Sequence, residues 1–219
     1  MAENLENPYP PEYFARQDER DDALFYTEPR KVVHIDEPAI QTLTNAYNDL
    51  LPADATILDL MSSWRSHLPL EQILPRLVVG LGMNREEMAD NFQLDEFIVH
   101  DLNAEPRLPF TDASFEAVVC AVSVQYLVQP LAIFQEVWRV LAPAGVFVVS
   151  FSNRCFPTKT TAVWLNTDDT QHVQLVASYF NLTGPWQDLN ARIKSFETGA
   201  PAEEEPLFIV WASKQVDEA

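Results

Sequence analysis

The chain has little glycine, and this shortage excludes most phosphate-binding loops. Its 219 residues include only 5 glycines, at positions 80, 82, 145, 184 and 199. Glycines at these positions fit neither a Walker-type loop nor a complete G-x-G-x-x-G fingerprint. Most nucleotide-phosphate sites are thereby excluded.

Positive charge is also scarce, and no apolar run is long. Lys and Arg total 14 against 33 Asp and Glu, which gives a formal net charge of -19. Such a charge repels nucleic acid and anionic membrane surfaces and would attract a basic protein partner. No apolar stretch reaches the roughly 20 residues that span a bilayer, and residues 1–22 are acidic and proline-rich, unlike a signal peptide. We therefore expect a soluble, cytoplasmic, acidic protein with no nucleic-acid or membrane partner.

Cysteine and histidine are few and scattered. Cys120 and Cys155 lie in or next to apolar segments without C-x-x-C spacing, which favours reduced core thiols. The four histidines, at 34, 67, 100 and 172, form no H-x-x-H or H-E-x-x-H group. The sequence therefore predicts no metal site.

Apolar runs alternate with amphipathic segments along the chain. Strands are predicted at 55–61, 76–83, 96–100, 115–124 and 145–152, all buried on both faces, and a last strand at 206–213. Helices are predicted after Asp36 up to Pro52, and at 67–74, 84–92, 129–141 and 168–180. This alternation is typical of an α/β domain: a single Rossmann-like, doubly wound, mostly parallel sheet with helices on both faces. At 219 residues we expect one such domain, 36–219, after a proline-rich N-terminal arm, 1–35, that is placed to cover a site.

In an open parallel sheet, ligands bind beyond the carboxyl ends of the strands. The segments to examine are therefore 59–64, 82–84, 101–102, 122–126 and 150–155. In order, these strand ends read ILDLMSS, VVGLGMN, VHDLNAEPRLPFTDASFEAVVCAVSVQYL and IFQEVWRVLAPAGVFVVSFSN. They resemble the successive motifs of class I S-adenosylmethionine-dependent methyltransferases over roughly residues 36–152. The linked set between Asp101 and Asn153 is the most specific part.

The resemblance implies S-adenosylmethionine as cofactor. The residues at matching positions are Asp59, Met61, Ser62, Ser63, Met83, Asn84, Asp101, Leu102 and Val122. Asp101 matches the acceptor of the adenine amino group, beside the Leu102 amide, although an aspartate there also suits a turn cap.

Two positions depart from the family pattern. The segment Asp59 to Arg65 has no glycine where the family has three, so Met61 and its neighbours would need a different loop path. Gly82 stands where the family usually has an acid that binds both ribose hydroxyls. Asn84 either compensates with hydrogen bonds or simply caps the following helix.

Polar and aromatic residues around the other strand ends are predicted to face the methyl acceptor. They are Tyr26, Arg30, His34, Trp64, Ser123, Tyr126, Asn153 and Arg154. His34 is either a base near neutral pH or an ordinary packed histidine, and Trp64 either walls the pocket or fills space left by glycine. Asn153, Arg154 and Lys159 would hold an anionic or carbonyl-bearing substrate, or would only form loop hydrogen bonds and surface salt bridges. No catalytic residue is assigned, because in-line methyl transfer depends largely on alignment.

The leading hypothesis is methyl transfer from S-adenosylmethionine to a small or medium-sized acceptor. The alternative is a methyltransferase-like protein without catalysis that acts as a binding or assembly factor. A nicotinamide-dependent oxidoreductase built on Gly80-x-Gly82 ranks last, since Arg85 occupies the third glycine position.

Overall fold

The structure of the chain, a computed structural model, describes residues 7–194 and 206–216. The strands are β1 (Thr56–Leu60), β2 (Leu77–Gly82), β3 (Glu96–Val99), β4 (Phe115–Ala121), β5 (Leu141–Phe151), β6 (Trp186–Lys194) and β7 (Leu207–Lys214). The α-helices are α1 (Asp22–Phe25), α2 (Glu37–Leu50), α3 (Leu70–Ile73), α4 (Arg85–Ala89), α5 (Pro130–Val140), α6 (Ala162–Leu165) and α7 (Asp169–Thr183). Two 3-10 helices are η1 (Pro11–Phe14) and η2 (Val124–Tyr126).

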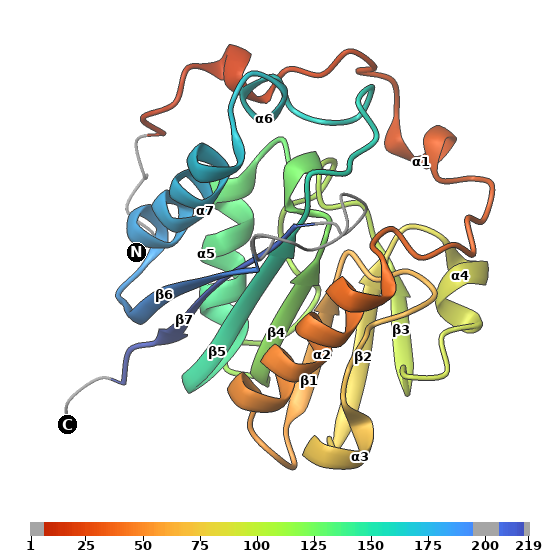
Figure 1. Cartoon of the computed structure of the whole chain (residues 1–219), viewed down its shortest axis with the longest axis vertical. Helices are drawn as coiled ribbons and strands as arrows, with labels where there is room; N and C mark the ends of the chain where they lie inside the picture. The colour runs from red at the N-terminus through yellow and green to blue at the C-terminus, as the bar shows by residue number, and fades with distance from the viewer. Residues whose placement is uncertain (1–6, 195–205, 217–219) are drawn as a thin grey trace, which may run out of the picture.

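These strands form one sheet in the order β3-β2-β1-β4-β5-β7-β6 (Figure 1). The first five strands of the chain run parallel, and β7 is antiparallel to both of its neighbours. Because β1 lies between β2 and β4, the order of strands reverses there, which opens a crevice at their carboxyl ends. The predicted doubly wound, mostly parallel sheet is confirmed.

Side chains along a strand point alternately to the two faces of the sheet, so both faces carry apolar side chains, and helices cover both. In β1, Ile57 packs in the apolar layer beneath α2, whereas Leu58 and Leu60 pack in the layer beneath α5 and α7. Figure 1 shows α2 on one face, with α5 and α7 on the other. As predicted, α2 begins after Asp36, whose carboxylate accepts a hydrogen bond from the Ala39 amide at 2.8 Å. Burying each large apolar side chain contributes roughly 1.5–3 kcal/mol to this packing.

The structure corrects three predicted elements. β3 is not buried on both faces, because it is an edge strand: Glu96 is exposed and Val99 is 44% exposed. β5 begins at Leu141, ahead of a register shift against β4 that the sequence does not mark. β6 was not predicted, because its sequence WQDLNARIK is polar and its pairing with β7 is broken near Asp188, which has φ 55°.

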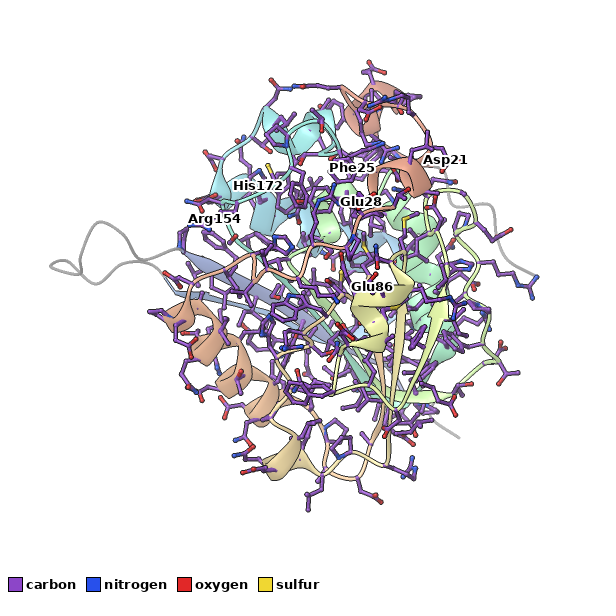
Figure 2. The ribbon with its side chains drawn as sticks, turned by 90° about the vertical axis from the view of Figure 1, so that its right-hand side faces the viewer. Asp21, Phe25, Glu28, Glu86, Arg154 and His172 are labelled. Atoms are coloured by element: carbon purple, nitrogen blue, oxygen red, sulfur yellow. The ribbon has the colours of Figure 1, made fainter. Side chains whose placement is uncertain are left out.

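The N-terminal arm crosses the carboxyl end of the sheet, above α4 (Figure 2). Residues 7–35 contain only η1 and α1 as regular elements, which fits the proline-rich sequence; residues 1–6 lie outside the described part. Backbone hydrogen bonds join the arm to the segment after β5, from Asp18 N to Thr158 O at 2.9 Å and from Ala162 N to Ala15 O at 2.8 Å. Phe14 is buried against the main core. The arm is therefore packed onto the sheet domain.

Candidate cofactor and acceptor site

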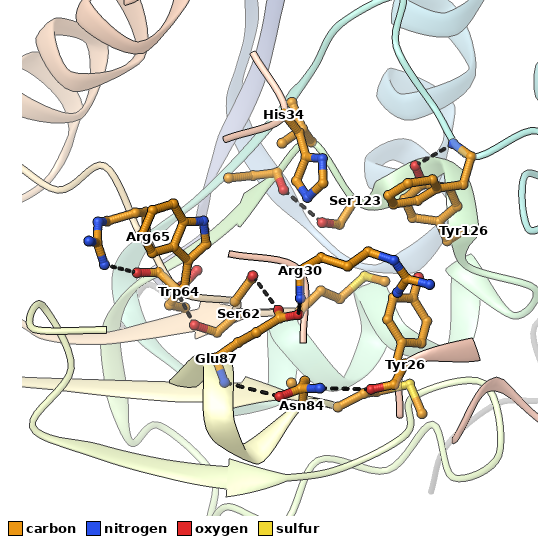
Figure 3. A pocket seen from close by; sticks show the side chains of 18 of the residues that line it. Tyr26, Arg30, His34, Ser62, Trp64, Arg65, Asn84, Glu87, Ser123 and Tyr126 are labelled. Carbon is orange, nitrogen blue, oxygen red and sulfur yellow. Dashed lines mark hydrogen bonds between the residues drawn. The ribbon is translucent and has the colours of Figure 1, made fainter. Parts of the chain in front are cut away.

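A cavity of about 620 Å³ lies where the arm covers the carboxyl ends of β1 to β4 (Figure 3). Its walls come from the loops after these strands, from the start of α4, from the segment after β5 and from residues 22–34 of the arm. Volumes of roughly 300–1,000 Å³ are usual for sites of small ligands. The cavity is therefore the first candidate for a binding site.

The loop after β1 keeps a glycine-like backbone at its first position without having a glycine. Met61 has φ 59°, in the left-handed region that ordinary residues rarely adopt. The next residue, Ser62, donates its amide hydrogen to Leu81 O at 2.8 Å, so the loop is tied to β2. A Cβ atom on Gly82 would lie 2.1 Å from Ser62 O. The loop therefore rests directly on the end of β2 and leaves no room there for a side chain.

Asp59 is buried beneath this loop, at the end of β1. Its Oδ2 accepts hydrogen bonds from the hydroxyls of Ser62 and Ser66, both at 2.6 Å. Burial raises the pKa of the Asp59 carboxyl to about 6, because the charged form loses water, and the two hydroxyls offset only part of that cost. The Asp59 carboxylate lines the cavity, and a hydrogen-bond donor or a cation bound there would stabilise its charged form.

The start of α4 joins the sheet to the arm. Asn84 caps the helix, since its Oδ1 accepts from the Glu87 amide at 3.0 Å, and its Nδ2 donates to Tyr26 O at 2.8 Å. The Glu87 carboxylate accepts from Ser63 Oγ and from the Arg30 amide, each at 2.5 Å. Three segments that are distant in sequence thus meet at one helix turn.

At the end of β3, Asp101 shapes a turn and faces the cavity. Its Oδ1 accepts from the amides of Asn103 at 2.8 Å and Ala104 at 3.3 Å. Leu102, the next residue, is buried. The turn-capping role is thus real, and it uses one of the two carboxylate oxygens.

The opposite side of the cavity is aromatic and carries a cation. The Arg30 guanidinium lies 4.3 Å from the ring centre of Phe25 and 5.5 Å from that of Phe156. Its Nη2 donates to Phe25 O at 2.9 Å, and its Nη1 has no partner within the described residues. Tyr126 stacks on Phe156 and accepts that residue's amide hydrogen at 2.9 Å. The His34 and Phe156 rings pack edge to face, with their centres 5.4 Å apart.

The comparisons with known proteins agree with this geometry. Residues 67–149 match the profile of the methyltransferase domain family. A malonyl-[acyl-carrier protein] O-methyltransferase from Marinomonas is 33% identical over 73 residues, which is 33% of this chain and 27% of that protein. The bifunctional biotin-synthesis protein BioHC from Teredinibacter turnerae is 24% identical over 122 residues, 56% of this chain and 21% of that protein. The chain spans about a quarter of the length of these relatives.

Solved structures share the fold at low identity. A chain of the complex between the Haloferax volcanii Trm112 methyltransferase activator and a putative methyltransferase superposes with a TM-score of 0.61 at 15% identity, covering 82% of this chain and 92% of that one. A SAM-dependent methyltransferase from Aquifex aeolicus gives 0.55 at 14%, covering 88% and 97%. The [4+2]-cyclase SpnF gives 0.57 at 15%, covering 80% and 82%.

Residues 67–149 thus match the methyltransferase domain family, and the chain has the fold of class I methyltransferases.

The structure brings every predicted site residue to this cavity. From the cofactor group these are Asp59, Met61, Ser62, Ser63, Met83, Asn84, Asp101, Leu102 and Val122, and from the acceptor group Tyr26, Arg30, His34, Trp64, Ser123, Tyr126, Asn153 and Arg154. Their individual roles stay predictions. The side-chain amide of Asn84, however, already bonds to the Glu87 amide in the helix cap and to Tyr26 O in the arm.

Trp64 both lines the cavity and holds the arm. Its Nε1 donates to Val32 O at 2.9 Å, and the Arg65 guanidinium stacks 3.8 Å from the centre of its ring. Trp64 is therefore part of the cavity wall and a contact between the β1 loop and the arm.

Of the two roles that the sequence leaves open for Lys159, its position outside the cavity lining favours the salt bridge. It is buried, and its Nζ contacts Asp22 Oδ1 at 2.9 Å and Arg20 O at 2.7 Å. Asp22 also accepts two hydrogen bonds from Arg16. Lys159 thus holds the arm against the sheet domain through a salt bridge and hydrogen bonds.

Glu87 is a cavity residue that sequence reasoning missed. The spacing of Asn84 and Glu87 indicates a capping box, but only the Asn84 half forms, and the Glu87 carboxylate bonds to Ser63 and Arg30 instead. The signal available in the sequence was an acidic residue in the first turn of the helix after β2, at the carboxyl end of the sheet.

Within residues 7–194 and 206–216, no group of three or more metal-ligating side chains occurs, and Cys120 and Cys155 are both unbridged. None of the helices there combines the length and apolar character needed to cross a membrane.

Proposed function

We propose that the methyltransferase domain binds S-adenosylmethionine and directs its methyl group to a small or medium-sized acceptor. The observation that carries this proposal is the single cavity that joins the Asp59 and Asp101 carboxylates on one side to the aromatic wall around Arg30 on the other. Its volume of about 620 Å³ suits a cofactor together with part of an acceptor.

The cofactor side fits the chemistry of S-adenosylmethionine. The cofactor carries an adenine amino donor, an α-ammonium group and a sulfonium, all of which favour nearby carboxylates. Asp101 would accept a hydrogen bond from the adenine amino group through Oδ2, because the turn uses only Oδ1. Asp59 would provide negative charge below the Met61 loop. When bound, the cofactor supplies an electrophilic methyl group.

The acceptor side favours a molecule with an anionic group. Within the described residues Arg30 forms no ion pair, although its guanidinium is packed among aromatic rings at the cavity wall. Such a cation is stabilised by an anion. The malonyl group named in the Marinomonas relative is an acceptor of this class, and we propose a carboxylate-bearing acceptor here.

We propose that His34, in the cavity wall, takes the proton when the acceptor group is an alcohol or an amine. Burial, together with the positive charges of Arg30 and Arg154, lowers the pKa of its imidazole. The neutral form therefore prevails at pH 7 and can accept a proton.

Calorimetric titration with S-adenosylmethionine and with S-adenosylhomocysteine tests the proposal. Asp101→Asn retains an oxygen for the turn cap but places an NH₂ group against the adenine amino group, so we expect about tenfold weaker binding of both ligands. Asp95→Asn is the matched control, because Asp95 supports the opposite end of β3 through Val78 N at 2.8 Å. Absence of binding by the unaltered protein up to millimolar ligand would overturn the proposal.

The second candidate is a binding or assembly factor without catalysis. The observation in its favour is the contact of Ser62 O with Gly82, which occupies the place of the family's ribose-binding acid. A cyclase shares the fold, so the fold does not fix the reaction. Failure to bind either ligand, together with capture of a basic protein partner, would support this candidate.

A further inference from the structure

Glu87 is a buried carboxylate whose partners are all neutral. It lies in the first turn of α4, is 7% exposed and lines the cavity. Within the described residues it accepts hydrogen bonds from Ser63 Oγ and the Arg30 amide and forms no ion pair. Burying a charge without a cation is costly unless hydrogen bonds satisfy it.

The hydrogen-bonding capacity of Glu87 is only half used. An ionised carboxylate offers about four acceptor sites. Oε1 accepts one bond from the arm and Oε2 accepts one from the β1 loop. Each oxygen therefore retains one acceptor site, and a ligand with two adjacent hydroxyl donors matches the pair.

The neighbouring positions cannot supply this function. A side chain on Gly82 would collide with the backbone of Ser62, whose oxygen lies 2.1 Å from the Cβ position. The Asp59 carboxylate lies lower in the site, bonded to two serine hydroxyls. Glu87 is the cavity carboxylate next to the end of β2, where an acid binds ribose hydroxyls in related nucleotide-binding sheets.

We propose that Glu87 binds a vicinal diol, the two ribose hydroxyls of the adenosyl group, in place of the side chain that Gly82 excludes. This inference rests on the proposed function. The same carboxylate accepts a hydrogen bond from the Arg30 amide, so Glu87 would bind the diol and the N-terminal arm at the same time.

Adenosine, 2′-deoxyadenosine and 3′-deoxyadenosine are the probes that test this role, with calorimetry as the readout. For the unaltered protein we expect about tenfold weaker binding for each hydroxyl removed, the usual cost of losing a hydrogen bond to a charged group. Glu87→Gln keeps one of the two side-chain oxygens, so it should weaken adenosine about tenfold and bind one of the two deoxynucleosides, the one that lacks the hydroxyl facing the lost oxygen, within about twofold of the unaltered protein.

Glu86→Gln is the matched control. Glu86 precedes Glu87 on α4, is exposed and pairs with Lys31 at 2.9 Å (Figure 2). This variant should bind all three nucleosides like the unaltered protein. Glu87→Asp keeps the charge but withdraws it by one methylene, and it should lose the preference for adenosine; it also serves as the second variant if Glu87→Gln fails to fold.

Two outcomes overturn the inference in distinguishable ways. If Glu87→Gln weakens adenosine and both deoxynucleosides equally, Glu87 only supports the loop and the arm, and the proposed function still stands. If the unaltered protein binds neither adenosine nor S-adenosylhomocysteine, the proposed function fails together with the inference.

Discussion

At the scale of single residues, Asp59 carries an electrostatic cost that ligand binding can recover. Burial raises the pKa of its carboxyl from 3.8 to about 6 in the folded chain. The folded state therefore binds the proton more tightly than the unfolded state, and Asp59 destabilises the fold increasingly as the pH rises from about 4 to 6. Such a cost at a cavity floor is typical of a functional group rather than a structural one.

We predict that Asp59→Asn gains stability relative to the unaltered protein as the pH rises through this window. The difference in free energy of unfolding should grow by roughly 3 kcal/mol between pH 4 and pH 7.5, since each pKa unit corresponds to about 1.4 kcal/mol. Urea unfolding at several pH values measures it. Asp49→Asn, which removes one exposed carboxylate from α2, controls for the change in net charge. A difference that stays constant with pH would contradict the prediction.

Residue patterns predicted where the site lies better than what each residue does. Strand ends of a parallel sheet converge on one edge, so the positions of Asp59, Asp101 and Tyr126 followed from the strand pattern. The hydrogen-bond partners of these residues could not be predicted from the sequence, because they depend on the paths of the loops. The use of Asn84 as a tie to the arm and the turn of Glu87 toward Ser63 both arise from contacts between segments far apart in the chain.

At the scale of elements, the arm is held by a buried ionic cluster. Asp22, Arg16 and Lys159 have side chains at most 7% exposed, and Lys159 alone contacts both Asp22 and the backbone of the arm. Hydrogen bonds from Arg16 hold the pKa of Asp22 low despite its burial, and the Lys159 ammonium acts in the same direction. The cluster is therefore charged at neutral pH.

We predict that Lys159→Met releases the arm. Removing one partner from a buried ionic cluster costs about 3–5 kcal/mol, because Asp22 is left buried without the Lys159 ammonium. Limited proteolysis should cut between residues 15 and 34 much faster than in the unaltered protein, and the affinity for S-adenosylhomocysteine should fall. Arg20→Ala is the control, because Arg20 is 78% exposed in its pair with Asp18. Unchanged proteolysis would show that the arm is held by other contacts.

The elements that sequence reasoning missed are those with weak periodicity. Helix α2 and the central strands have strong apolar patterns and were predicted closely. β6 lies at the outer edge of the sheet and contains mostly exposed polar residues, so no apolar alternation marks it. The sequence predicts a buried β3 because most of its residues are apolar. The strand order places β3 at the other edge of the sheet, and the sequence pattern does not reveal that order.

At the scale of the whole molecule, the net charge of -19 sets up a field that acts on charged ligands. S-adenosylmethionine has a net charge of about +1 at neutral pH, through its ammonium, sulfonium and carboxylate groups, whereas S-adenosylhomocysteine is neutral overall. Charges at a distance from the cavity therefore attract the first ligand and have little net effect on the second. Salt screens this attraction, since the Debye length falls to about 8 Å at physiological ionic strength.

We therefore predict different salt dependence for the two ligands. Raising KCl from about 20 to 300 mM should weaken S-adenosylmethionine binding by about threefold or more and change S-adenosylhomocysteine binding by less than about twofold. Calorimetry under both conditions measures the two affinities, and a neutral osmolyte at matched osmolality controls for water activity. Equal losses for both ligands would mean that the contacts within the cavity, rather than the charge of the whole chain, set the electrostatic part of the affinity.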